Sequence, residues 1–156
     1  MVRAILAIIV SYAVMAVVLT GLCLGGFVIL GVDRFFQPDY YLVSPLWMAI
    51  SLLIAAVTAL LGGYVCAAIS GSMTVCKVLA LLIFTLHFVF CFSKMHEDPH
   101  IRAGDVAVRD VMNLAQMPLW MHILTPTVGA ISVLLGARIR QQKGGNHFSS
   151  PESRKM

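Results

Sequence analysis

Residues 46–69 read LWMAISLLIAAVTALLGGYVCAAI, and this stretch decides the fold. It contains no Asp, Glu, Lys or Arg, and about 20 apolar residues are enough for a helix to cross the hydrocarbon of a bilayer. Small residues recur at every fourth position along it and just beyond: Ser51, Ala55, Ala59, Gly63, Ala67 and Gly71. Because residues four apart share a helix face, these small side chains form a groove where another helix can pack closely.

Three further runs have the same character. Residues 4–30, 78–92 and 119–137 also lack Asp, Glu, Lys and Arg. The whole chain is 60% hydrophobic and 12% charged, whereas soluble domains average about 45–50% apolar and about 25% charged residues. We therefore predict an all-α integral membrane four-helix bundle. Its membrane domain would cover 1–138, with spans at 4–30, 46–69, 75–93 and 118–138, and 139–156 would be a disordered basic tail.

The basic residues predict the orientation. Arg3, Lys77 and the basic residues from Arg138 onward fall on one side of the four predicted spans. A smaller set that shares its loops with acidic residues falls on the other side: Arg34, Lys94, Arg102 and Arg109. Since cytoplasmic loops carry the excess of Lys and Arg, we expect a multi-pass inner-membrane protein with both termini in the cytoplasm. The net charge of +4 is thereby explained by topology, and nucleic acid is not an expected partner.

Two other spans carry small residues at helical spacing. Span one has Gly21-x-x-x-Gly25, and span four has Ser132-x-x-x-Gly136. Lipid gives helices no hydrophobic reason to associate, so close backbone contact through small residues supplies much of the attraction. We expect span two to be the central helix. The predicted helix-packing residues are Gly21, Gly25, Ala55, Ala59, Gly63, Ala67, Ser132 and Gly136.

The segments that join the spans also carry signals. Ser44-Pro45 predicts a helix start, with a serine cap followed by a first-turn proline. Aromatic residues cluster near this point and predict a belt at the outer interface: Phe35, Phe36, Tyr40, Tyr41, Trp47 and Trp120. Residues 104–117 alternate polar and apolar faces at helical spacing and predict a short amphipathic helix on that interface. Pro126 lies inside span four and should kink it.

Histidines are the main candidates for chemistry. His87 and His122 lie at similar depth below the predicted outer surface, and Cys91 is one helical turn from His87. His96 and His100 follow in the outer loop. Imidazole and soft sulfur ligands suit copper or zinc, and two facing imidazoles suit haem. The same residues serve equally well as hydrogen-bonding or interfacial histidines, so we expect no cofactor, with haem, copper or zinc as the alternative.

Other classes of site receive little support. The four cysteines include no C-x-x-C pair, which disfavours a membrane thiol oxidoreductase built on that motif. Coupled transporters usually place ionisable residues inside their spans, and here only His87 and His122 qualify. No phosphate loop, nucleophile elbow or paired carboxylates are present, so no catalytic residue is expected.

Several stretches resemble small bacterial four-span membrane proteins of unknown function. The residues that carry the resemblance are the start Met1-Val2-Arg3-Ala4, then Ser44-Pro45-Leu46-Trp47, Leu61-Gly62-Gly63-Tyr64-Val65 and Leu134-Leu135-Gly136-Ala137-Arg138. The resemblance covers most of the chain and implies the four-span fold without an activity.

The sequence favours a structural or accessory subunit. Such a protein would act through helix packing with other membrane protein subunits or with itself, within the lipid bilayer. The first alternative is a metal- or haem-binding membrane redox protein that uses His87 and His122. The second is a small transporter, which would have to oligomerise to form a pore.

Overall fold

Four long helices form most of the protein. The computed structural model describes residues 2–37, 40–94 and 117–145. The long helices are α1 (Val2–Leu30), α3 (Pro45–Ser70), α4 (Met73–Lys94) and α6 (Leu119–Gly145). Each contains a stretch that is long and apolar enough to cross a membrane. The prediction of four such helical segments is therefore confirmed, with helix bounds close to those expected.

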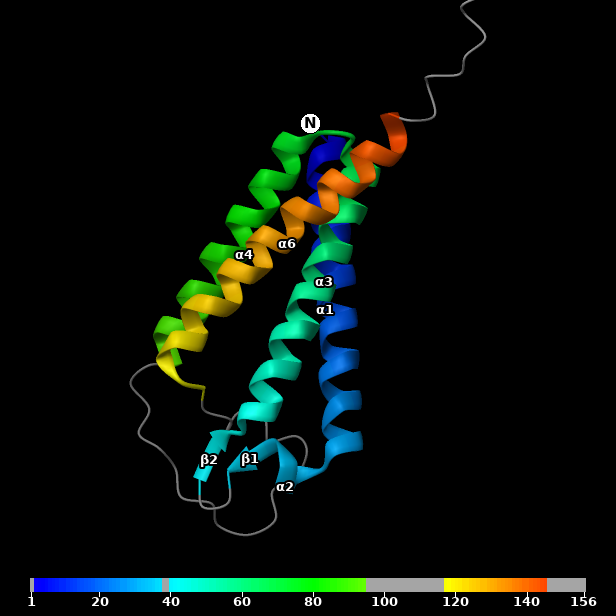
Figure 1. The fold of residues 1–156 in the computed structure, drawn as a ribbon. Coiled ribbons are helices and arrows are strands. Elements are labelled where there is room, and N and C mark those ends of the chain that lie inside the picture. The colour runs from blue at the N-terminus through cyan, green and yellow to red at the C-terminus, as the bar shows by residue number, and fades with distance from the viewer. Residues whose placement is uncertain (1, 38–39, 95–116, 146–156) are drawn as a thin grey trace, which may run out of the picture.

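Helix α3 is the central helix. It contacts α1, α4 and α6, and its interface with α6 is the most extensive in the molecule. The start of α1, the α3–α4 turn and the end of α6 lie together at what we call the terminal end of the bundle (Figure 1). The opposite end, where α1 leads into α3 and α6 begins, is called the hairpin end. Small residues on α3 explain why three helices can approach it, since they let backbones come close.

The apolar core near the terminal end is built from all four long helices. Its side chains are mostly small, which matches closely spaced helices rather than a core of bulky residues. The buried members are Ala7, Ala59, Cys66, Ala67, Cys76, Leu79, Ala80, Val133 and Ala137.

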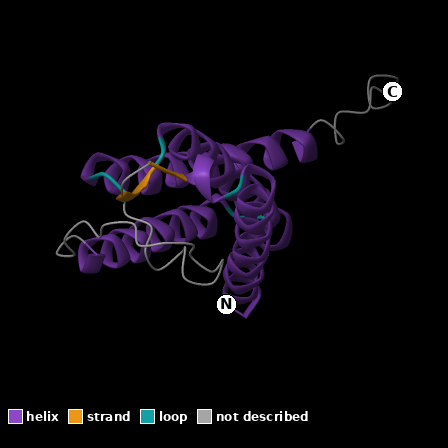
Figure 2. Cartoon of the chain, turned by 90° about the horizontal axis from the view of Figure 1, so that it is seen from below, coloured by secondary structure: helices purple, strands orange, loops and turns teal. Residues whose placement is uncertain are grey.

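The connection between α1 and α3 folds into a short helix and a hairpin, which the all-α prediction did not include. Helix α2 (Val32–Phe35) leads into the antiparallel strands β1 (Phe36–Gln37) and β2 (Tyr40–Val43). Seen from the hairpin end, the strands are a small addition to a helical body (Figure 2). Aromatic and β-branched residues favour strands, and the Pro38-Asp39 pair between them is typical of turns, so the local sequence explains the difference.

This hairpin buries an aromatic cluster against α1 and α3. The Phe35 ring centroid lies 4.5 Å from that of Trp47 and 5.3 Å from that of Phe27. Phe35, Phe36 and Trp47 are only 6%, 2% and 3% exposed. The prediction that these three residues belong to an interfacial belt is wrong, because folding of the hairpin turns them inward. Trp120, in contrast, is 56% exposed.

Ser44 fixes the hairpin to the start of α3, as the predicted cap. Its hydroxyl accepts a hydrogen bond from the Trp47 amide at 3.2 Å and donates one to the Arg34 carbonyl at 2.6 Å. Its own amide donates to the Phe35 carbonyl at 2.8 Å. The N-terminal amides of a helix lack partners within the helix, so Ser44 both caps α3 and binds the preceding chain to it.

Helix α6 differs from a simple span at two places. Pro126 lies inside it, as predicted, and the Thr127 hydroxyl donates to the Ile123 carbonyl at 2.7 Å. The helix also continues to Gly145, so residues 139–145, expected in the disordered tail, are helical. Good helix-forming residues extend it, and the Arg140 guanidinium lies 5.9 Å from the Tyr64 ring centroid on α3. The predicted amphipathic helix at 104–117 lies almost entirely outside the described residues.

Candidate functional site

Helices α3 and α6 cross at very close range. A Cβ atom placed on Gly63 would collide with the backbone carbonyl of Val133, and one placed on Gly136 would collide with the carbonyl of Leu60. The two backbones are therefore in direct contact, which only glycine permits at these positions. The remaining small residues predicted on this face are placed as follows: Ala59, Ala67 and Ser132 are buried, and Ala55 is half-buried.

The two ends of the small-residue series have local roles instead. Gly71 terminates α3 in a left-handed conformation with φ 66°, and its amide donates to the Ala67 carbonyl at 2.9 Å. The Ser51 hydroxyl donates to the Met48 carbonyl of its own helix at 3.0 Å. Gly62, which the four-residue spacing does not include, faces α1, where a Cβ would collide with the Met15 side chain. Adjacent glycines thus serve two different helix contacts.

The glycine pair on α1 meets no other described part of the chain. Atoms added as Cβ at Gly21 and Gly25 would have nothing within 4 Å. Leu22 between them is 43% exposed, and Val28 after them is 75% exposed. Helix α1 packs on the bundle through a different set of residues: Ala7, Ser11 and Phe27. As far as the described residues go, Gly21-x-x-x-Gly25 therefore lies on an uncovered apolar face, which we call the α1 face.

The structure brings two of the predicted histidines together. His87 on α4 and His122 on α6 are half-buried and close enough to interact electrostatically. The Cys91 side chain and residues His96 and His100 lie outside the described part, so their relation to this pair is not described. Among the described residues, no three or more His, Cys, Asp or Glu side chains gather as a metal-binding group. Two imidazoles can supply two ligands to a metal ion or to haem iron.

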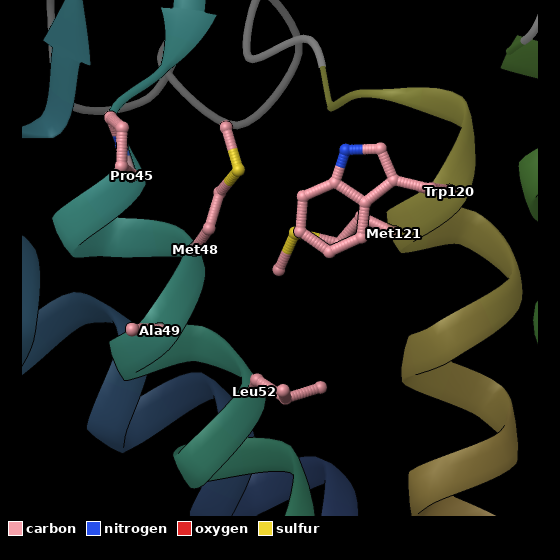
Figure 3. A pocket seen from close by; sticks show the side chains of 6 residues that line it. All are labelled: Pro45, Met48, Ala49, Leu52, Trp120 and Met121. Carbon is pink, nitrogen blue, oxygen red and sulfur yellow. The ribbon is translucent and has the colours of Figure 1, made fainter.

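An apolar groove at the hairpin end was not predicted. It has a volume of about 290 Å³ and lies between the first turns of α3 and α6, where these helices separate (Figure 3). Its walls are Pro45, Met48, Ala49, Leu52, Trp120 and Met121. Thioether side chains adapt to irregular apolar shapes, so the groove suits a hydrocarbon chain. The sequence offers no signal for it, because it arises from the angle between two helices.

Two buried thiols also come together, on α3 and α4. Cys66 and Cys76 are both 0% exposed, lie in the same buried cluster, and are close enough for their side chains to interact electrostatically. The sequence places both residues near one membrane face without indicating that they touch. Cys23, on α1, is half-buried near the hairpin end.

The described site features are thus a tight helix crossing, an open glycine pair, two neighbouring histidines, an apolar groove and two paired thiols. Comparisons with protein-family models, with curated proteins and with solved structures give no match to this chain.

Proposed function

We propose that the protein is a structural or accessory subunit that binds another integral membrane protein through the α1 face. The observation that carries the proposal is the contrast between the two sets of glycines. Gly63 and Gly136 pack within the α3–α6 crossing. A Cβ at Gly21 or Gly25, in contrast, would contact no other described residue. In lipid, small residues at this spacing allow a second helix to approach closely.

The rest of α1 supports the same role. Its residues are largely apolar and exposed, for example Val17 at 73% and Ile29 at 84%. An uncharged face of this kind is stable against lipid, and it also fits a partner helix without desolvating any charge. Together with the excess of basic residues at the terminal end, it favours an inner-membrane location with cytoplasmic termini.

Co-purification from native membranes tests the proposal. The double variant Gly21→Leu/Gly25→Leu should retain its thermal unfolding temperature, since a Cβ at either position has no atom of the described residues within 4 Å. It should lose a membrane protein that the wild type carries in fixed proportion. The matched control Ile5→Leu changes an exposed position on the opposite side of the same helix and should keep that partner. Equal partner recovery with all three proteins would contradict the proposal.

A second candidate function is metal or haem binding, because His87 on α4 and His122 on α6 are close enough to interact electrostatically. Elemental analysis and a visible spectrum of the purified protein test this candidate. A bound metal or haem band that is lost in His87→Ala/His122→Ala would support it. Protein purified after supplying haem, copper and zinc, with neither metal nor haem absorbance, would remove it.

A further inference from the structure

The turn between α3 and α4 holds two cysteines that neither the fold nor the proposed function requires. Cys66 lies one turn before the end of α3, and Cys76 lies in the first turn of α4. Both are 0% exposed and belong to the apolar core near the terminal end. A buried cysteine packs as a small apolar residue, but two of them side by side also form a pair that can be oxidised.

The turn geometry is what places the two residues opposite each other. Gly71 adopts a left-handed conformation that ends α3, and only Ser72 separates it from the start of α4. The Ser70 hydroxyl donates to the Cys66 carbonyl at 2.7 Å, and the Ser72 amide donates back to that hydroxyl at 3.3 Å. These bonds hold the reversal tight, so the last turn of α3 faces the first turn of α4.

The thiols meet across this reversal. The Cys76 thiol donates to the Ser72 carbonyl at 3.4 Å, and the Cys66 side chain lies close enough to interact with it electrostatically. Both residues belong to the same buried cluster. A disulfide requires two cysteines on neighbouring backbone segments whose side chains point toward each other. Cys66 and Cys76 lie five residues before and five residues after Gly71, where the chain reverses, so they face each other across the turn.

The surroundings favour an uncharged product over a metal complex. Both sulfur atoms lie among apolar side chains of the core, including Leu79 and Ala80, and Lys77, next to Cys76, is exposed. Zinc normally takes four ligands, and among the described residues no third His, Cys, Asp or Glu joins the two thiols. A disulfide is neutral and apolar, so it can form without adding charge to the core.

We propose that Cys66 and Cys76 are a dithiol pair that a lipid-soluble quinone oxidises to an intramolecular disulfide, which ties α3 to α4. Each thiol gives up one proton and one electron, and one S–S bond forms. The quinone takes up both electrons and both protons and becomes a quinol. A dithiol reductant reverses the step by thiol–disulfide exchange. A quinone is the class of oxidant that fits, because both sulfurs are buried in helices apolar enough to span a membrane.

The test uses the full-length chain in lipid vesicles, treated with a short-chain benzoquinone and then denatured, alkylated and digested. We expect two of the four cysteines to escape alkylation, with a Cys66–Cys76 linked peptide and a mass lower by two hydrogen atoms. Dithiothreitol should restore both thiols. Cys23→Ser, which alters a cysteine on α1, should still form the link.

Two variants and a second oxidant make the result decisive. Cys66→Ala and Cys76→Ala should both lose the link while still unfolding in one cooperative thermal transition, lowered only by the lost packing of one small side chain, so that loss of fold is separated from loss of the thiol. Oxidised glutathione, which is water-soluble, should leave both thiols free. The proposal is overturned if Cys66 and Cys76 stay fully alkylated after quinone treatment, or if the link forms only with glutathione. This inference does not depend on the proposed function.

Discussion

At the scale of single residues, the helix contacts depend on glycines at positions where a Cβ atom would collide with the neighbouring helix. Gly63 and Gly136 allow the backbones of α3 and α6 to touch, and Gly62 allows Met15 of α1 to pack on the other side of α3. Gly129, also on α6, is different, because a Cβ there would meet nothing within 4 Å. Glycines that are equivalent in the sequence therefore differ in what they do, and the difference can be measured.

Gly63→Ala should destabilise the folded protein by about 1–3 kcal/mol or more, because the added methyl overlaps a backbone carbonyl and forces α3 and α6 apart. Gly129→Ala is the matched control, and it should be neutral or stabilising by about 0.5–1 kcal/mol, the usual gain of Ala over Gly in a helix. Thermal unfolding in detergent micelles measures both. If the two variants unfold alike, the close contact at Gly63 is not what holds the crossing together.

The sequence could predict much of this residue pattern. The spacing of Ala59, Gly63 and Ala67 predicts a close-packed face, and these residues are buried in the structure. The sequence could not predict that Gly71 ends the helix. Gly71 continues the four-residue spacing of small residues, and a glycine in that spacing looks the same whether it packs against another helix or caps its own. Nor could it predict the contact of Cys66 with Cys76, because depth along a helix follows from the sequence whereas rotation about its axis depends on the neighbouring helices.

At the scale of elements, the hairpin end is held by one serine and one aromatic cluster. Ser44 joins β2 to α3, and its hydroxyl bonds two parts of the backbone at once. Trp47 packs so closely on α1 that a Cβ at Gly26 would lie 2.8 Å from its ring. The sequence predicts the cap but not the hairpin, because the aromatic residues near Ser44 equally fit a belt facing lipid headgroups.

Ser44→Ala should lower the free energy of unfolding by about 1–2 kcal/mol, since loss of a serine N-cap costs about 0.5–2 kcal/mol. The effect should fall at the upper end of the range for caps, since the Arg34 carbonyl loses its partner as well. Ser51→Ala is the control, because that hydroxyl bonds only within its own helix in the structure. Hydrogen exchange of the first turn of α3 and a thermal melt provide the measurement. Equal effects of the two substitutions would contradict the role given to Ser44.

At the scale of the whole molecule, the four long helices are unequally used. Helix α3 is surrounded by the other three, and α6 lies along both α3 and α4. Helix α1 contacts the bundle chiefly through α3 and leaves the α1 face open. The sequence predicts the number and approximate bounds of these helices, because uncharged apolar runs of this length are typical of membrane-spanning helices. It does not predict that the glycine pair of α1, unlike Gly63 and Gly136, meets no other described residue, since all four runs are similarly apolar.

The most direct test of the account is site-specific photo-crosslinking from the α1 face in native membranes. A benzophenone amino acid would replace Leu22, which lies between Gly21 and Gly25, and in a control it would replace Leu53, which is 65% exposed on α3. We predict a discrete crosslinked membrane protein from position 22 and none of that mass from position 53. Lipid adducts alone at both positions, or the same protein adduct from both, would contradict a binding role for the α1 face.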